Sequence, residues 1–238
     1  HCTKARSVLL CPALRREKPG YPSSPRKQEV PNVIRPTLQF VSPATVERII
    51  QEAIDILKDP GVRVHSERAL GLLGDHGAQV DLKSKVARIP ADLVWRAADA
   101  APRSFYLYDF EGQPAVHYGG DDVQFDPGSG ALKFLDYGTT ASRAPLTADF
   151  VRYIKLAESL PALDAVSTAL VCSDVPRQVA DLYRLFLVLL YARKPVVTGA
   201  FAVGTWHVMK DLLAAVAGSE KALAETPTAV FDLSLIHI

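Results

Sequence analysis

The second half of the chain alternates between two spacings of hydrophobic residues. Short apolar runs predict buried strands, at 165–171, at 195–198 and from 228 to about 233. Apolar residues at helical spacing predict helices before and between these strands, at 147–160, 176–192 and 206–217. Strands that alternate with helices of this length indicate a parallel sheet with crossover helices.

Local signals predict the ends and the apolar positions of these helices. Thr147 is the expected N-cap of the first helix, and Gly218 is expected to end the third. The apolar face of the first helix is formed by Phe150, Val151, Ile154, Ala157 and Leu160. The apolar positions of the second helix are Val179, Leu182, Tyr183, Phe186 and Leu190.

The preceding region predicts smaller elements of both kinds. Ser42 and Pro43 begin a helix with an apolar stripe, and Ser66 and Gly77 are the expected caps of a second helix. Short strands are predicted at 62–64 and 86–89, and a third helix follows Pro90. Four alternating runs then predict an antiparallel meander or a pair of hairpins, at 105–108, 115–118, 123–125 and 132–135.

The order of these elements predicts the fold class. Residues 37–145 are expected to form an α+β region, and 146–232 the first part of a (β/α)8 TIM barrel. A complete barrel needs roughly 250 residues, and only about 90 show the alternation here, so we predict an incomplete α/β barrel from the N-terminal part of a larger enzyme. The ending at 233–238 resembles a translated sequencing adapter and is expected to be artefactual.

The charge distribution separates a leader from this body. Residues 1–36 hold eight of the 27 Lys and Arg residues, two carboxylates and six of the 17 prolines, so they carry +6 and the remainder −5. This composition predicts a disordered or non-native leader, because its prolines break the amphipathic helix of a transit peptide. The overall charge of +1 argues against a nucleic-acid-binding protein.

The sequence predicts neither a membrane span nor disulfide bonds in the body. The longest wholly apolar run, 185–192, is far shorter than a membrane span. Cys172 is the one cysteine of the body, which excludes a disulfide framework or a cysteine-rich metal site there. We therefore expect a cytoplasmic protein.

The glycines and histidines do not predict a phosphate-binding loop or a metal site. The glycine-rich stretch 119–130 lacks the Lys-Ser/Thr ending of a phosphate-binding loop, so tight turns between hairpin strands are the preferred interpretation. The histidines do not lie at metal-ligand spacing with any cysteine or carboxylate pair, and no metal is expected; they are His65, His76, His117 and His207.

Several polar residues follow the predicted strands, where parallel α/β enzymes carry their sites. Cys172 has no evident base nearby, and Asp174 is either a site residue or the N-cap of the next helix. Thr198 and Gly199 hold the equivalent place after the following strand, where glycine permits close approach of a ligand. His207 either faces the site or is an exposed residue at a helix start.

Residues 38–232 resemble the trimethylamine methyltransferase family. The resemblance rests on the order and spacing of several segments: Ala53–Leu57, Gly61–Ser66, Gly77–Asp81, Arg88–Val94, Ala100–Phe105, Asp181–Arg184 and Arg193–Phe201. It implies a cytoplasmic TIM-barrel enzyme that demethylates a methylated amine, trimethylamine or a betaine-like compound. The methyl group would pass to the Co(I) centre of a separate corrinoid protein.

The resemblance also implies the partners and the kind of site. No cofactor is bound directly, the corrinoid (cobalamin) is carried by a cognate partner protein, and the full-length enzyme is expected to be a homo-oligomer. Aromatic faces and carboxylates suit a methylated ammonium cation, and the local candidates are Tyr137, Tyr183, Phe201, Trp206 and Asp174. The substrate-binding candidates are Asp174, Thr198, Gly199, Phe201, Trp206 and His207. No catalytic position can be carried over, because the pyrrolysine of some members lies in the later half of their barrel.

Two other functions stay open at this point. One is a different TIM-barrel enzyme, a decarboxylase or a metal-dependent methyltransferase, which would require metal ligands. The other is a non-enzymatic ligand-binding module built on 37–145. If the chain is a barrel fragment, we expect it to be inactive as it stands, because an unclosed barrel exposes strand edges and apolar faces.

Overall fold

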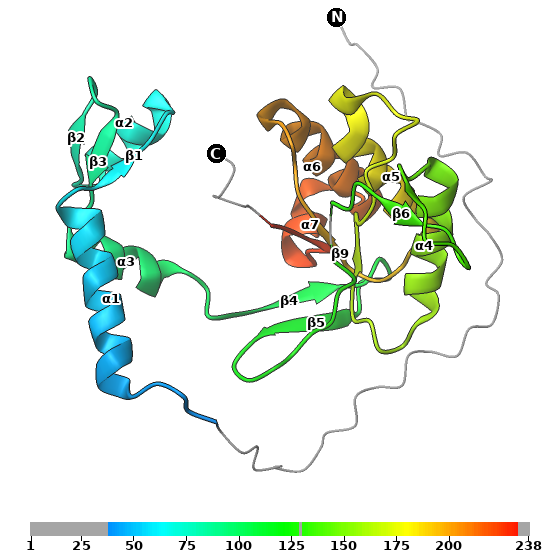
Figure 1. The fold of residues 1–238 in the computed structure, drawn as a ribbon, viewed down its shortest axis with the longest axis horizontal. Helices are drawn as coiled ribbons and strands as arrows, with labels where there is room; N and C mark the ends of the chain where they lie inside the picture. The colour runs from blue at the N-terminus through cyan, green and yellow to red at the C-terminus, as the bar shows by residue number, and fades with distance from the viewer. Residues whose placement is uncertain (1–37, 129, 233–238) are drawn as a thin grey trace, which may run out of the picture. The chain divides into compact units, whose positions relative to one another are not determined.

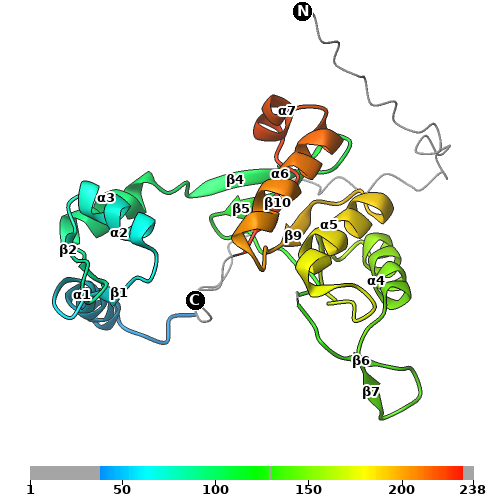
Figure 2. The same cartoon turned by 90° about the horizontal axis from the view of Figure 1, so that it is seen from above.

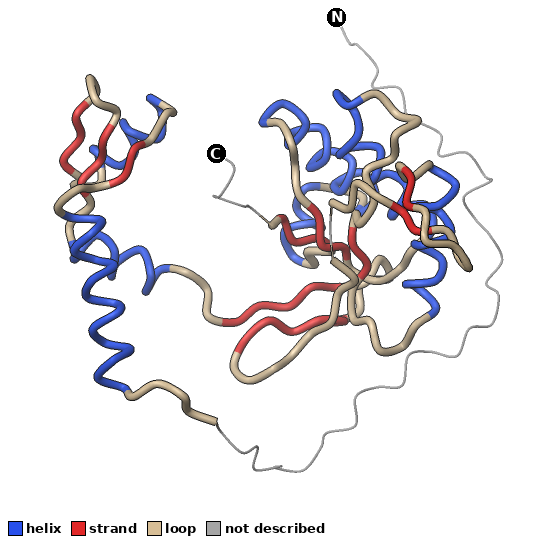
Figure 3. The backbone as a smooth tube through the Cα atoms, viewed as in Figure 1, coloured by secondary structure: helices blue, strands red, loops and turns tan. Residues whose placement is uncertain are grey.

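The computed structural model describes residues 38–128 and 130–232 (Figures 1 and 3). The leader predicted at 1–36 and the tail predicted at 233–238 lie outside these residues. Residues 38–42 belong to one structural unit, and the elements described below belong to a second unit that begins at Pro43.

The first segment of this second unit combines three helices with a small antiparallel sheet. The strand order is β1-β3-β2, and both pairings are antiparallel. The elements are α1 (Pro43–Lys58), β1 (Val62–Arg63), α2 (Glu67–Asp75), β2 (Gln79–Asp81), β3 (Val86–Arg88) and α3 (Ala91–Ala100). The predicted helices and two of the strands are confirmed, and β2 was not predicted.

The ends of α2 follow the sequence signals. The hydroxyl of Ser66 accepts a hydrogen bond from the backbone N–H of Ala69, as expected of an N-cap. At the other end, Gly77 has φ +107° and donates to the Gly74 carbonyl, while Ala78 donates to the Leu73 carbonyl. This pair of bonds is a Schellman motif, which requires the left-handed backbone that glycine adopts without strain.

The following segment contains two hairpins. Strands β4 (Ser104–Tyr108) and β5 (Pro114–Gly119) pair antiparallel, and so do β6 (Phe134–Leu135) and β7 (Ser142–Arg143). The first predicted hairpin is confirmed, whereas the second pairs β6 with β7, a strand that was not predicted. The prediction of a strand at 123–125 is wrong. The backbone of Phe125 is instead hydrogen-bonded to Asp164, two residues before β8.

A three-stranded parallel sheet with crossover helices forms the rest of the described chain. The strand order is β10-β9-β8, so sequential strands are neighbours. The elements are α4 (Thr147–Ser159), β8 (Val166–Ser167), the 3-10 turn η2 (Arg177–Val179), α5 (Ala180–Tyr191), β9 (Val196–Thr198), α6 (Val203–Ala217), α7 (Glu220–Glu225) and β10 (Ala229–Phe231). The parallel α/β prediction is confirmed; the described sheet is open, so the barrel stays a prediction.

Several boundaries differ from the prediction. Strand β8 is shorter than 165–171, α6 begins three residues before 206, and the short helix α7 was not predicted. The N-cap of α4 is Leu146 and not Thr147, because the carboxylate of Asp149 accepts a hydrogen bond from the Leu146 backbone N–H. The side chain of Asp149, in the first turn, thus takes the place of the Thr147 cap that the sequence predicted.

The main core lies between the parallel sheet and its helices, which stand side by side in the order α4, α5, α6 (Figure 2). Val166 and Val196 contribute from the sheet and are fully buried. The helices contribute Phe150, Ile154, Leu185, Val188, Met209 and Leu213. These side chains are large and apolar, so their burial supplies the main driving force for folding of this part.

The opposite face of the sheet is covered by the first hairpin. Val197 and Val230 alternate with the residues of the main core, and they pack against Leu107, Val116 and Ala165. Backbone bonds from Tyr108 to Pro227 and from Phe110 to Arg193 attach the hairpin just before β10 and β9. The hairpin therefore lies against the amino ends of these strands.

The glycine-rich stretch leads into a backbone bridge with the residues that follow β8. Ala131 forms a parallel bridge with Leu170, donating to the Ala169 carbonyl at 2.6 Å and accepting from Val171 at 3.0 Å. Positive φ angles at Gly128 and Gly130 are those of tight turns, but these turns do not join hairpin strands as predicted, because 123–125 is not a strand. The bridge pairs the backbone at 169–171, where unpaired backbone groups would otherwise be open to other chains.

The apolar positions predicted for the second helix do not all face the core: Leu182 and Tyr183 pack against it, whereas Val179, Phe186 and Leu190 are exposed. Phe186 and Leu190 are each 41% exposed, whereas Leu185 and Val188 are fully buried. The helix has apolar residues around most of its surface, so periodicity alone did not identify the face that contacts the sheet.

This difference gives a matched test of the core. We expect Leu185→Ala to lower the free energy of unfolding by about 2–5 kcal/mol, because it leaves a cavity between α5 and the sheet. The same truncation at Leu190, on the exposed side of the same helix, should cost less than about 1 kcal/mol. Urea unfolding followed by circular dichroism measures both, and equal losses would contradict this packing.

Candidate functional site

The carboxyl ends of the parallel strands bring together loops that are distant in sequence. Ser173 and Asp174 follow β8, residues 199–202 join β9 to α6, and Asp232 follows β10. The backbone N–H of Asp232 donates to the Thr198 carbonyl at 2.8 Å, which continues the pairing of β9 and β10. Ligands of parallel α/β proteins bind at this end of the sheet, so it is the candidate site.

A buried carboxylate holds the loop between β9 and α6. Asp181, 1% exposed, accepts hydrogen bonds from the Phe201 backbone N–H at 2.9 Å and from the Thr205 hydroxyl at 2.5 Å. It also accepts from the backbone N–H of Leu182. Burial alone would raise the pKa of Asp181, but these hydrogen bonds outweigh it and the pKa lies below its ordinary value. The carboxylate therefore remains charged and fixes the loop.

Arg184, one turn further along α5, lies beneath the same loop. Its side chain is 2% exposed, and its guanidinium donates to the Thr168 carbonyl at 2.6 Å. The guanidinium carbon is 4.4 Å from the centroid of the Phe201 ring, a cation–π contact. Burial lowers the pKa of Arg184, and the negative charge of Asp181 opposes that effect. The two charged residues together orient Phe201, a residue that is 61% exposed.

Sequence reasoning did not identify Asp181 and Arg184 as site residues, although both belong to a segment that resembled the family. The available signal was a pair of charged residues three positions apart in an otherwise apolar helix. Charged side chains are rarely buried unless they are paired or hydrogen-bonded, so such a pair points to a structural or positioning function.

The candidates on β9 are held closely by their neighbours. The Thr198 hydroxyl is buried and lies 2.9 Å from the hydroxyl of Thr168, on the side of the sheet that faces the helices. At Gly199, an added Cβ would lie 3.2 Å from the Asp232 carbonyl oxygen. Glycine thus allows the ends of β9 and β10 to approach each other. Thr198 contacts Thr168 on the helix side of the sheet and does not face the loop ends.

An aromatic pair joins α6 to the end of β10. The Trp206 and Phe231 rings meet edge to face, with centroids 4.4 Å apart. Trp206 remains 39% exposed, and His207 beside it on α6 is exposed. Phe231 had not been singled out from the sequence, because pairing of β9 with β10 was needed to bring it there.

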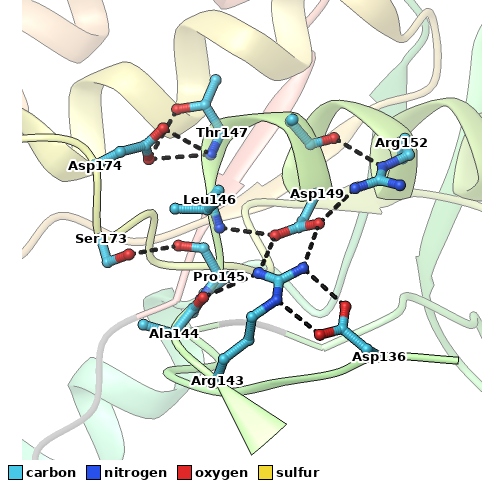
Figure 4. Close-up of polar contacts among 11 residues, drawn as sticks. Asp136, Arg143, Ala144, Pro145, Leu146, Thr147, Asp149, Arg152, Ser173 and Asp174 are labelled. Carbon is cyan, nitrogen blue, oxygen red and sulfur yellow. Dashed lines mark hydrogen bonds and ion pairs between the residues drawn. The ribbon is translucent and has the colours of Figure 1, made fainter. Parts of the chain in front are cut away.

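Asp174 caps a helix, but not the one that follows it. Its carboxylate accepts from the Thr147 backbone N–H at 3.0 and 3.2 Å and from the Thr147 hydroxyl at 3.1 Å (Figure 4). The proposed N-cap at the start of the next helix is therefore wrong. Negative charge at the amino end of α4 is favourable to the helix dipole.

A second polar cluster lies at the same end of α4 (Figure 4). The Asp149 carboxylate, 1% exposed, forms a bidentate pair with Arg143 at 2.7 and 3.0 Å and a further bond to Arg152 at 2.7 Å. Arg143 also pairs with Asp136 at 2.8 and 2.9 Å. The bond from Arg143 is the main cause that lowers the pKa of Asp149 to about 2. This cluster fixes the β6–β7 hairpin against α4.

The remaining candidates lie elsewhere. Tyr137 is fully exposed in the β6–β7 hairpin. Tyr183 lines an apolar groove of about 430 Å³ between α5 and α6, on the outer side of these helices. Cys172 is buried, and burial raises the pKa of its thiol, which keeps it protonated and poorly nucleophilic.

Among residues 38–128 and 130–232, no group of three or more His, Cys, Asp or Glu residues is arranged to hold a metal ion. No helix in that part of the chain is long and apolar enough to cross a membrane.

Known proteins match most of this chain. A sequence model of the family described as Trimethylamine methyltransferase (MTTB) matches residues 13–233. Trimethylamine methyltransferase MttB of Desulfitobacterium hafniense is 26% identical over 174 residues, which cover 73% of this chain and 35% of that protein. The proline betaine:corrinoid methyltransferase of Eubacterium limosum is 27% identical over 164 residues, covering 66% and 32% respectively.

The parallel sheet with its loops at the carboxyl end defines an α/β protein of the kind that carries a site there. The family match is more specific. The chain belongs to the trimethylamine methyltransferase family, so the resemblance seen in the sequence is confirmed. It spans about a third of the length of the two relatives above.

The Asp149 cluster yields a prediction about pH. Because the folded pKa of Asp149 lies below its ordinary value, its contribution is present above about pH 4 and is lost as the pH falls toward 2. Asp149→Asn should lower the free energy of unfolding at pH 7 by about 1–2 kcal/mol, a figure reduced for the solvent exposure of Arg143.

The matched control is Asp136→Asn, which removes the other carboxylate from the same guanidinium. Asp136 is 45% exposed, so its loss should cost less than about 1 kcal/mol. Urea unfolding at pH 7 and pH 3 measures both variants. A cost of Asp149→Asn that stayed constant between the two pH values would contradict the assignment.

Proposed function

We propose that the protein carrying this chain transfers a methyl group from a small methylated amine to a corrinoid carried by a partner protein. The observation that supports this most strongly is the family match over 13–233. The Desulfitobacterium relative is named for trimethylamine and the Eubacterium relative for proline betaine and a corrinoid, so the substrate class is a methylated amine or betaine.

We further propose that β8, β9 and β10 belong to a (β/α)8 barrel that is preceded by the α+β region at 37–145. Adjacent strands in sequential order, all parallel and linked by helices, support this assignment. Such a barrel presents the loops after β8, β9 and β10 at one end. The protein is expected to act in the cytoplasm.

The substrate would bind through its positive charge. A methylated ammonium has few or no N–H donors, so the faces of aromatic rings are its natural partners. Phe201 and Trp206 expose part of their rings at the carboxyl end of the sheet. Asp181 and Arg184 fix Phe201 from below, and Phe231 supports Trp206 from the side.

The protein's own contribution would be binding and orientation. The corrinoid of the partner supplies the cobalt nucleophile that accepts the methyl group. For a displacement of this kind, one N–CH3 bond must point toward the nucleophile, and holding that geometry accounts for a large share of the rate. A fixed loop serves this purpose better than a mobile one, which gives the buried Asp181 a function in the reaction.

The experiment uses the protein that carries this chain at the length of its relatives. It is mixed with a reduced corrinoid acceptor and with trimethylamine or proline betaine, and methylation of the corrinoid is followed by its absorbance. We expect transfer from at least one amine. Trp206→Leu should raise KM by roughly 3–30-fold, the range of a cation–π contact.

Trp95→Leu is the matched control, because Trp95 is 49% exposed on α3 and has no part in the proposed site. Its KM should not change. The 238-residue chain assayed alone should transfer no methyl group. Absence of transfer by the longer protein with every amine would overturn the proposed function, and equal KM values for the two tryptophan variants would overturn the site.

A further inference from the structure

The outer face of the β4–β5 hairpin carries a group of polar residues that the proposed methyl transfer does not use. In this hairpin Ser104 pairs with Gly119, and Tyr106 pairs with His117. Side chains alternate between the two faces, so Leu107 and Val116 face the sheet. Ser104, Tyr106 and His117 share the other face, where Ser104 and Tyr106 are exposed.

Ser104 and His117 of this face and Asp122, just after β5, are joined in the order Ser–His–Asp. The Ser104 hydroxyl is 2.7 Å from Nε2 of His117. Nδ1 of the same ring is 2.6 Å from the Asp122 carboxylate. A carboxylate at Nδ1 holds the proton on that nitrogen, which leaves Nε2 as an acceptor for the serine proton.

Neighbouring residues hold this arrangement and keep it accessible. The Tyr106 ring lies 4.5 Å from the His117 ring, centroid to centroid, and restricts its rotation. Opposite Ser104, a Cβ at position 119 would lie 2.8 Å from the Ser104 Cβ and 3.0 Å from its hydroxyl oxygen. Glycine at 119 therefore leaves the nucleophile uncovered. The His117 side chain is 26% exposed, so a small substrate can reach it.

We propose that Ser104, His117 and Asp122 form a second site, which hydrolyses activated acyl esters. Such triads are defined by the geometry and functions of their members and not by the fold that carries them. The site lies on the hairpin that contacts the amino ends of β9 and β10, whereas the methyl-transfer site is at their carboxyl ends. The two proposals are therefore independent.

The reaction follows from the hydrogen bonds. The Ser104 oxygen attacks the acyl carbon while its proton moves to Nε2 of His117. The bond from the acyl carbon to the leaving oxygen then breaks, and Nε2 gives that proton to the leaving oxygen, which departs as the alcohol. Water attacks the acyl serine while one of its protons moves to Nε2; the bond from the acyl carbon to the Ser104 oxygen breaks, and Nε2 returns the proton to this oxygen as the acid leaves. The net reaction consumes one ester and one water and yields one acid and one alcohol.

The substrate class follows from what the site offers. A nucleophile with a positioned base speeds attack by roughly 10²–10⁴-fold, which suffices for esters whose leaving group departs without further help. The half-exposed ring of Tyr106 lies next to the base, and flat aromatic groups stack on such a surface. Aryl esters meet both conditions.

The test is covalent labelling of the full chain with a fluorophosphonate. Attack by Ser104 forms an oxygen–phosphorus bond and breaks the phosphorus–fluorine bond, and the serine proton passes to His117. Peptide mass spectrometry identifies the modified serine. Ser104 should be labelled at least about 100-fold faster than Ser142, an exposed serine of the other hairpin.

Two conservative variants complete the design. Asp122→Asn should slow labelling of Ser104 by roughly 100-fold, because an amide does not hold the histidine proton on Nδ1. Ser104→Ala should abolish the initial release of nitrophenol from p-nitrophenyl acetate, and Ser142→Ala should not. Equal labelling of Ser104 and Ser142 in the wild-type chain overturns the proposal whatever the variants do, and an unchanged rate in Asp122→Asn overturns the triad.

Discussion

The carboxylate of Asp181 joins three parts of the parallel α/β region. It accepts hydrogen bonds from the first turn of α5, from the Phe201 backbone and from the Thr205 hydroxyl on α6. Two crossover helices are thereby attached to one loop at the carboxyl end of the sheet. The arrangement of Phe201 over Arg184 depends on this attachment, and so does the proposal that the loop presents aromatic surface to a cation.

Much of the architecture follows from the sequence. Strand and helix spacings gave the parallel α/β order, and Ser66, Gly77 and Gly218 marked helix ends that the structure contains. The errors arose where a residue with a strong local preference makes a contact with a distant segment instead. Asp174 is a good N-cap, but folding places it at Thr147, 27 residues earlier in the chain. The spacing of residues within one segment does not show that a side chain will cap a helix in a different segment.

The candidate site was predictable in place but not in composition. Gly199 was singled out because it follows a strand, and Phe201 because an aromatic ring suits the cation that the family resemblance implies. Asp181 lies on a helix that is apolar around most of its surface, so its contact with Phe201 required the packing of α5 against the sheet. Ser104 and His117 are 13 residues apart, and the hairpin register was needed to bring their side chains within 2.7 Å.

The most direct test of this account is hydrogen exchange at the backbone amide of Phe201 in the wild-type chain and in Asp181→Asn. If the carboxylate holds the loop, this amide should exchange at least about tenfold faster in the variant, a change of about 1.4 kcal/mol. The amide of Val196, which donates to Thr228 between β9 and β10, should keep its rate. An unchanged rate at Phe201, or an equal increase at both amides, would contradict the central function of Asp181.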